Sequence, residues 1–338
     1  MIEKLPHRLY FPQPLPLRHC TIPSATGFGN MFRKIKDQLV RNNIRIKISD
    51  GNSLELFIET LFAVNRIRRT SIFYSMWETS ILKKGSVPLI NQANMVIVPS
   101  VYNKILFREN KIDKPIAVVP LGVDTDAYYQ INKLNQHVFT FGIAGTYHNR
   151  KNIPFVINTF KKVFAGMPAV LKLKTNNDVK NVKFASMFNY YPQVQTESKN
   201  YTDHEMCKWY NSLDVFISCA HSEGFGLHQL EAMACGVPVI SPKFGGVTEY
   251  FDESVGYCVD YKMASAKNNS EPYYDGEWCD ATEESLADKM MIAYNNREET
   301  YNLGLKARER ALLFTWDQTA IKLIKKINNY CSTRCILT

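Results

Sequence analysis

Short apolar runs alternate with amphipathic segments along most of the 338-residue chain. A short apolar run predicts a buried strand, whereas apolar residues that recur every three or four positions predict a helix with one buried face. Strands that alternate with helices are typical of βαβ units, in which parallel strands form a sheet covered by the helices. We therefore expect an α/β fold with parallel sheets.

The pattern assigns elements along both halves of the chain. Ser100 precedes one helical pattern as a predicted N-cap, and Thr202 with Glu205 predicts a capping box before another. Polar residues 261–280 predict a loop after the last strand. The predicted strands are residues 44–48, 71–75, 95–99, 116–120, 138–144, 170–174, 215–218, 237–241 and 256–259. The predicted helices are residues 31–42, 54–62, 101–108, 153–165, 203–211, 283–295, 298–313 and 316–329.

The sequence Pro-Leu-Gly-Val-Asp at residues 120–124, followed by a polar stretch to Gln136, interrupts this alternation. The chain is long enough for two domains of about 150 residues each. We expect an N-terminal domain over residues 1–130 and a second α/β domain beginning at residue 131.

Composition excludes several protein classes. No run reaches the 18 apolar residues of a membrane-spanning helix, and residues 1–6 lack the apolar core of a signal peptide. We therefore expect an intracellular, cytoplasmic protein. The eight cysteines form no Cys-x-x-Cys pair, which favours reduced thiols over a zinc site or a disulfide framework.

The positive charge is concentrated in the first half of the chain. The net charge is +9; residues 1–130 carry 18 Lys and Arg against 10 Asp and Glu, whereas residues 131–338 carry 23 against 22. A basic half favours an anionic partner, such as a phospholipid surface, a phosphorylated acceptor or nucleic acid. Solubility alone explains the same charge, and the two interpretations stay open here.

Residues 222–240, with the sequence SEGFGLHQLEAMACGVPVI, carry the clearest chemical signal. Gly224 and Gly226 predict a tight loop with unusual backbone angles, and the helix that starts near Leu227 directs free N–H groups at it, as in a phosphate site. Glu223 and Glu231 bracket this loop, where carboxylates could accept hydrogen bonds from sugar hydroxyls. An ordinary α/β loop with two surface glutamates is the alternative.

This stretch resembles the E-x7-E signature of retaining GT-B glycosyltransferases of family four, the glycosyl transferases group 1 or glycogen-synthase-like family. The likeness covers roughly residues 70–330, including residues 77–78, 94–103, 120–124 and 314–316. It implies a GT-B fold, with two Rossmann-like domains whose parallel sheets face a central cleft. The domains would be residues 1–130 on the acceptor side and 131–312 for the nucleotide sugar, with a C-terminal helix over 313–338 that crosses back to the first domain.

The resemblance also implies roles in the E-x7-E segment. Glu231 would bind the donor ribose and Glu223 the transferred sugar. The backbone amides of Phe225, Gly226 and Leu227 would hold the diphosphate or the sugar.

In the family, basic residues after the first strand of the second domain neutralise the leaving diphosphate. Lys151 matches the usual lysine, whereas Thr146 stands where the family has arginine, so Arg150 is the candidate for that role. A solvated helix start is the alternative reading of Arg150 and Lys151.

Further candidates lie outside this segment. Gly27 and Gly29 resemble the family's glycine loop that faces the donor, and Glu78 stands near its acceptor-side histidine, either as a substitute for it or as a structural carboxylate. His221 and His228 flank the glycine loop, with donor contact and a spectator role both open. Asp124-Thr125-Asp126 resembles a metal-binding DxD only superficially, so we expect no metal and no cofactor.

The resemblance implies retaining, metal-independent transfer of a hexose from a nucleotide-diphosphate sugar to the hydroxyl of a glycan, a lipid-linked or another anionic acceptor. The departing phosphate itself would take the acceptor's proton. The alternatives are a glycosyltransferase that acts on modified DNA bases, a non-catalytic protein that binds nucleotide sugars or nucleic acid, and an epimerase. The basic helix at residues 319–327 either contacts an anionic inner membrane surface peripherally or packs on its own protein, as the family implies.

Overall fold

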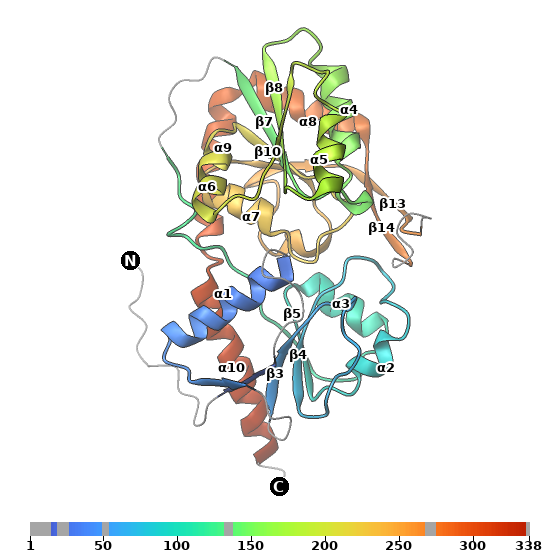
Figure 1. The fold of residues 1–338 in the computed structure, drawn as a ribbon, viewed down its shortest axis with the longest axis vertical. Helices are drawn as coiled ribbons and strands as arrows, with labels where there is room; N and C mark the ends of the chain where they lie inside the picture. Colours follow the sequence, from blue (N-terminus) through green and yellow to red (C-terminus); the bar gives the residue numbers. More distant parts are fainter. Residues whose placement is uncertain (1–14, 19–26, 49–53, 132–137, 268–274, 336–338) are drawn as a thin grey trace. The chain divides into compact units, whose positions relative to one another are not determined.

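The structure is a computed structural model that describes residues 15–18, 27–48, 54–131, 138–267 and 275–335 (Figure 1). The chain divides into two compact units. The first comprises Met1–Trp77, Leu82–Gly122 and Thr315–Thr338, and the second comprises Glu78–Ile81 and Val123–Phe314. The domain limits at residues 130 and 312 stay predictions. The N-terminal residues 1–6, the polar stretch at 132–136 and part of the expected loop at 261–280 lie outside the described residues.

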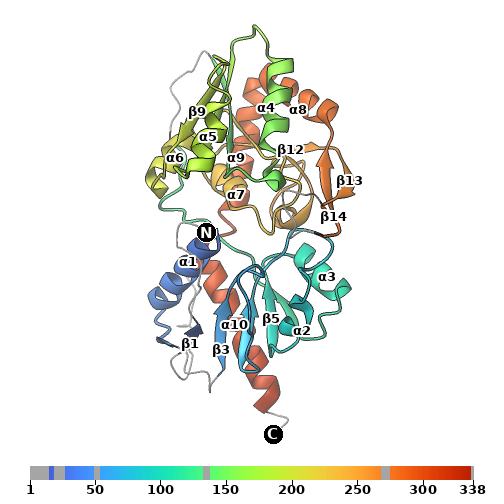
Figure 2. The same cartoon turned by 45° about the vertical axis from the view of Figure 1, so that its right-hand side comes forward.

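The first unit contains a six-stranded sheet in the order β2-β1-β3-β4-β5-β6, in which every neighbouring pair is parallel. Helices α1 and α10 lie together on one side of this sheet, and α2 and α3 lie on the other (Figures 1 and 2). Met31, Ile35 and Leu39 recur every fourth position along α1 and are fully buried, as an amphipathic helix on a sheet requires. The elements are β1 (Leu15–Arg18), α1 (Gly27–Arg41), β2 (Ile46–Ile48), β3 (Glu55–Ile58), β4 (Ser71–Tyr74), α2 (Ser86–Ile90), β5 (Met95–Val98), α3 (Val101–Glu109), β6 (Ile116–Val118) and α10 (Trp316–Cys335).

Strand β3 corrects a prediction, because residues 54–62 had the spacing of a helix. A helix over residues 54–62 would bury its apolar residues on one face and leave Glu55 on the exposed side. Instead Glu55 is buried in the strand, where it pairs with Arg68 at 3.0 Å and accepts a hydrogen bond from Ser71 at 2.6 Å. A buried, paired carboxylate on a central strand gives the same sequence pattern as the polar side of a helix.

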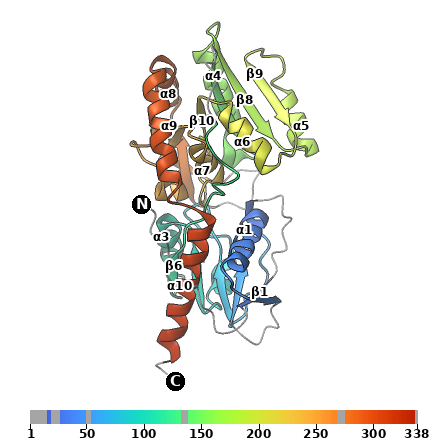
Figure 3. The same ribbon diagram turned by 90° about the vertical axis from the view of Figure 1, so that its left-hand side faces the viewer.

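The second unit contains another parallel six-stranded sheet, in the order β12-β11-β10-β7-β8-β9. Helices α4, α5 and α8 cover one face, and α6, α7 and α9 lie on the other (Figures 1 and 3). The elements are β7 (Phe139–Ala144), the 3₁₀ turn η1 (Asn149–Lys151), α4 (Ile153–Val163), β8 (Ala169–Thr175), α5 (Val179–Ser186), β9 (Val194–Ser198), α6 (Asp203–Asn211), β10 (Val215–Ile217), α7 (Leu227–Ala234), β11 (Val239–Pro242), η2 (Gly245–Glu249), β12 (Gly256–Val259), α8 (Glu283–Asn295) and α9 (Arg297–Ala311).

Strand β10 separates two layers of the second unit's core. Val215 and Ile217 join the cluster formed with α4 and α8. Phe216 points to the opposite face, since successive side chains of a strand alternate. There its ring contacts Trp209 and Tyr210 of α6, with centroids 6.4 and 5.6 Å away. This packing holds α6 against β10.

Residues 261–280, predicted as a loop, contain a hairpin of β13 (Tyr261–Ser265) and antiparallel β14 (Glu277–Ala281). The prediction of a loop is wrong because many positions of this hairpin are exposed, so its strands contain polar residues and no apolar run. Trp278 and Cys279 are buried, whereas Lys262 and Asp280 are exposed. Both predicted helix caps are confirmed, since Ser100 accepts from the backbone N–H of Asn103 and the capping box at Thr202 is complete.

Candidate functional site

The loop between β10 and α7 is shaped by one glycine. Gly226, the N-cap of α7, has φ 86° in the left-handed region, and no side chain caps the helix there. A Cβ at this position would lie 2.7 Å from Tyr250 Oη and Val247 Cγ1. The prediction of unusual angles at Gly224 is wrong, since its φ is not positive; instead its carbonyl packs directly against Gly246, where a side chain would not fit.

Tyr250 supports this loop from inside the protein. Its side chain is fully buried, and its hydroxyl donates to the Phe225 carbonyl at 3.0 Å and contacts the carbonyl of Gly226. The backbone N–H of Gly246 also donates to the Glu223 carbonyl at 2.7 Å. The carbonyl groups of Glu223, Phe225 and Gly226 thus accept hydrogen bonds from groups inside the protein. The sequence did not predict this role of Tyr250, because Tyr250 lies 24 positions beyond Gly226.

Glu223 forms a buried ion cluster with the two predicted cations. Its carboxylate lies 2.6 Å from Lys151 Nζ and 3.0 Å from Arg150 Nη1. Arg150 also donates to the Ser222 carbonyl at 2.6 Å, and the side-chain exposure of the three charged residues is only 12–18%. The alternative of a solvated helix start is therefore wrong for Arg150 and Lys151.

The turn after β7 places these cations. His148 Nδ1 accepts from the Arg150 backbone N–H at 3.3 Å, and the Arg150 carbonyl accepts from the His221 N–H at 2.8 Å. Asn152 then takes a left-handed conformation, with φ 51°, between η1 and α4. Thr146, the residue in place of the family's arginine, lies exposed in the turn before η1.

Glu78 approaches the cluster from the segment Glu78–Ile81 of the same unit, with its Oε1 3.8 Å from Arg150 Nη2. Burial raises the pKa of Glu78, Arg150 lowers it by a smaller amount, and Glu223 adds to the rise. Its side chain is 13% exposed, so it is a partly buried carboxylate beside Arg150.

The charges within the cluster shift one another. Burial alone would raise the pKa of Glu223, but Lys151 and Arg150 outweigh it and hold this pKa at about 2. Burial, followed by the charges of Arg150 and Lys151, lowers the pKa of His148 to about 4. At neutral pH Glu223 is therefore ionised and His148 is neutral.

Glu231 lies on α7 in a different environment. It is 9% exposed, and the hydroxyl of Tyr210 donates to its Oε2 at 2.9 Å. The same hydroxyl lies 2.9 Å from His228 Nδ1, which is 3.4 Å from Glu231 Oε2. Tyr210 lies inside the predicted helix 203–211, but nothing in its sequence position marked it as a partner of Glu231.

The predicted glycines on the N-terminal side belong to the first unit. Gly27 and Gly29 were expected in a loop before a helix, but α1 itself begins at Gly27, so both lie in its first turn in the first unit. A glycine-rich sequence does not prevent a helix whose next turns bury Met31 and Ile35 in the core.

Metal-like spacing at Asp124 and Asp126 has a structural role. Asp124 Oδ1 accepts from the backbone N–H groups of Asp126 and Ala127, which closes a turn. No group of three His, Cys, Asp or Glu side chains suited to a metal ion occurs among the described residues.

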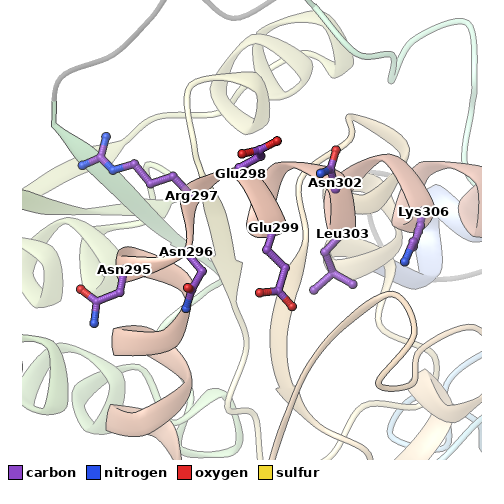
Figure 4. Close-up of a pocket in the computed structure, with 8 residues that line it drawn as sticks. All are labelled: Asn295, Asn296, Arg297, Glu298, Glu299, Asn302, Leu303 and Lys306. Carbon is purple, nitrogen blue, oxygen red and sulfur yellow. The ribbon is translucent and has the colours of Figure 1, made fainter.

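One sizeable pocket lies away from all these groups. It has a volume of about 650 Å³ at the junction of α8 and α9, where Figure 4 shows its side chains projecting from the two helices. Its lining residues are Asn295, Asn296, Arg297, Glu298, Glu299, Asn302, Leu303 and Lys306. None of them is a predicted site residue.

Helix α10 settles the open question about residues 319–327. Leu323, Ile324 and Ile327 are fully buried, so this helix packs on its own protein and its apolar face does not lie on lipid. Within the described part of the chain, no helix combines the length and apolar character needed to cross a bilayer.

The family model that matches this chain covers most of the second unit. The model of the family "Glycosyl transferases group 1" matches residues 124–310. A D-inositol 3-phosphate glycosyltransferase of Paenarthrobacter aurescens is 31% identical over 117 residues, which are 34% of this chain and 24% of that protein. A probable sucrose-phosphate synthase of Thermosipho melanesiensis is 30% identical over 176 residues, 46% of this chain and 40% of that protein. The chain therefore spans less than half the length of either relative.

Solved structures extend the likeness to both units. Anabaena HepE, solved with UDP and glucose, aligns with 93% of this chain and 100% of its own, with a TM-score of 0.66 and 13% identity. Sucrose-phosphate synthase of Thermosynechococcus elongatus aligns with 92% of this chain and 81% of its own, with a TM-score of 0.63 and 16% identity. These likenesses and the two parallel sheets confirm the predicted GT-B fold. With more than half of its length matched by the family model, the chain belongs to the glycosyl transferases group 1 family.

Proposed function

We propose that this chain is a glycosyltransferase that moves a hexose from a nucleotide-diphosphate sugar to an acceptor hydroxyl, with retention of anomeric configuration and without a metal. The observation that carries the proposal is the convergence of Arg150, Lys151 and Glu223 beside the uncapped N-terminus of α7. Two buried cations and free backbone N–H groups form a site suited to a diphosphate.

Cleavage of the glycosyl–phosphate bond places negative charge on the departing phosphate and positive charge on the sugar ring. Arg150 and Lys151 would stabilise the departing diphosphate, since preorganised charges in a water-poor site act most strongly where charge develops. That phosphate would then accept the proton of the attacking acceptor hydroxyl.

Glu223 has two consequences for donor binding. Diphosphate oxygens that reach Arg150 and Lys151 must share these cations with Glu223 or displace it. A carboxylate beside the sugar position also stabilises the positive charge that develops on the sugar ring more in the transition state than in the ground state, so the arrangement favours charge separation. We place the hydroxyls of the transferred sugar at Glu223 and the ribose at Glu231.

We propose a uridine diphosphate sugar as the first donor to test, because HepE was solved with UDP and glucose. The excess of basic residues in 1–130 supports an anionic acceptor, which includes acceptors at a membrane surface. Gly27, Gly29, Glu78 and Thr146 stay candidates for contacts with donor or acceptor.

The test is a thermal-shift and calorimetric screen of UDP, GDP, ADP and dTDP with their sugars, in buffer with a chelator. We expect one nucleotide class to raise the melting temperature of the wild type, because ligand that binds only the native state stabilises it. Arg150→Ala and Lys151→Ala should remove this shift. The proposal fails if no nucleoside diphosphate binds, or if binding requires a divalent metal.

A further inference from the structure

Tyr210 connects two polar side chains of α7 through one buried hydroxyl. Its side chain is fully buried, and its Oη lies 2.9 Å from Glu231 Oε2 and 2.9 Å from His228 Nδ1. The ring is held by Phe216 on β10 and by Tyr128, with centroids 5.6 and 6.1 Å away. Packing of the ring therefore restricts where the hydroxyl can lie.

The Tyr210 hydroxyl has one proton to donate and two hydrogen-bond partners, and this determines the tautomer of His228. An ionised carboxylate only accepts hydrogen bonds, so the single Tyr210 proton is donated to Glu231. His228 must then carry its own proton on Nδ1 and donate it to Tyr210 Oη. In the neutral ring Nε2 is left as an acceptor.

Both α7 side chains thus keep an acceptor atom for a ligand. Glu231 Oε1 receives no hydrogen bond from any of the described residues. The His228 side chain is 41% exposed, so its ring is open to a ligand, and Nε2 is the ring nitrogen that Tyr210 leaves unused. The two residues are three positions apart on one helix and face the same way.

We propose that Tyr210 is a positioning residue that holds Glu231 and His228 as a paired acceptor for two neighbouring hydroxyl groups of the donor, with the ribose diol as the fitting chemistry. The inference rests on the proposed function and adds His228 as a second donor contact. The Tyr210 hydroxyl would orient the side chains of Glu231 and His228 before the ligand binds. Binding then costs less side-chain entropy, and the affinity for the ligand is higher.

The main experiment measures UDP, 2′-deoxy-UDP and 3′-deoxy-UDP affinities by calorimetry for wild type and Tyr210→Phe. Tyr210→Phe removes the hydrogen bond that orients the Glu231 carboxylate. Because a hydrogen bond to a charged group is one of the stronger ones, we expect UDP binding to the variant to weaken about tenfold. The loss should be smaller for a deoxy analogue, because the missing ligand hydroxyl no longer needs the acceptor pair. Tyr128→Phe is the matched control: it removes another buried hydroxyl, which hydrogen-bonds Asp203 at 3.3 Å, whereas the hydrogen bond to Glu231 comes from Tyr210.

Two His228 variants separate its ring nitrogens. The amide nitrogen of His228→Asn can replace Nδ1 as the donor to Tyr210, whereas the amide oxygen of His228→Gln can replace Nε2 as an acceptor. We expect His228→Gln to retain more UDP affinity than His228→Asn. The opposite order would exclude Nε2 as the ligand contact.

A ligand-free readout covers the case in which Tyr210→Phe does not fold. Nitrogen-15 NMR of the neutral imidazole in wild-type protein should show the Nδ1–H tautomer at His228, and an Nε2–H tautomer overturns the proton arrangement.

The outcomes distinguish the two proposals. If wild type binds no nucleoside diphosphate, the proposed function and this inference both fail. If UDP binds and Glu231→Gln weakens it, while Tyr210→Phe binds UDP and both deoxy analogues like wild type, the inference alone fails.

Discussion

The two carboxylates of one motif occupy opposite environments. Glu223 lies among cations, with Lys151 and Arg150 at 2.6 and 3.0 Å. Glu231, eight positions later and about as buried, is held by the hydroxyl of Tyr210 and lies near the half-exposed His228. The difference comes from the neighbouring elements: the turn after β7 supplies the cations, and α6 supplies the tyrosine.

The two carboxylates therefore contribute in different ways, Glu223 through its charge and Glu231 through the position of its oxygen atoms. The Glu223 cluster is electrostatic, so its contribution depends on charge and should respond to pH and to neutralising substitutions. The Glu231 group is geometric, so its contribution depends on where acceptor atoms are held. Substitutions that remove charge but keep shape should therefore affect the two sites very differently.

The largest expected effect is on turnover at the cationic cluster. Lys151→Ala should lower the rate of nucleoside diphosphate release from the donor by about 10²–10³-fold, as the loss of one charge-stabilising group in a transition state does. Lys162→Ala, which removes an exposed lysine paired with Glu283, is the control and should leave the rate unchanged. A loss of less than about tenfold would place the leaving group elsewhere.

The next effect is on stability. Glu223→Gln should lower the free energy of unfolding by roughly 3 kcal/mol, because two buried cations lose their counter-charge. Glu283→Gln, at an exposed ion pair, should cost less than about 1 kcal/mol. Urea unfolding at neutral pH measures both, and equal values for the two variants would mean that the Glu223 cluster is effectively solvated.

The pH dependence of stability should single out the same carboxylate. The folded pKa of Glu223 is about 2, below its ordinary value of 4.5. Its contribution is therefore complete above about pH 4.5 and is lost as the pH falls toward 2. The unfolding free energies of wild type and Glu223→Gln should converge over this window, and a constant difference down to pH 2 would contradict the ion-pair account.

Local patterns made part of this site predictable. The spacing of Glu223 and Glu231, the glycine loop and the start of α7 are set by consecutive residues, and the capping box at Thr202 needs only four positions. Their partners depend on the order of strands in the sheet. Lys151 meets Glu223 across 72 positions because β10 lies beside β7, which no pattern near either residue reveals.

The errors in the fold have a related cause. Residues 54–62 carry a helical spacing, and only the tertiary contacts of Glu55 with Arg68 and Ser71 make a strand the better solution. The hairpin of β13 and β14 was missed because a two-stranded ribbon with exposed positions lacks the apolar runs that marked the parallel strands.

Gly226→Ala tests the loop that joins the two carboxylates. A methyl group there would lie 2.7 Å from Tyr250 Oη, on a backbone with φ 86°. We expect a loss of about 1–3 kcal/mol in unfolding free energy, as for a non-glycine residue forced into a strained conformation. Gly85→Ala is the matched control: it has φ 80° but no atom within 4 Å of the added Cβ, so it reports the backbone strain alone. Equal losses in the two variants would show that contact with Tyr250 has no cost.

The smallest expected effect on stability is at Glu231, and it completes the contrast. Glu231→Gln keeps an acceptor oxygen for the Tyr210 hydroxyl and leaves no buried cation without a counter-charge. Its unfolding free energy should therefore change by less than about 1 kcal/mol, because exchanging one hydrogen-bond acceptor for another preserves most of the net contribution. Urea unfolding beside Glu223→Gln provides the comparison under identical conditions. A loss at Glu231 as large as that at Glu223 would mean that its negative charge, and not its position, is what Tyr210 and His228 require.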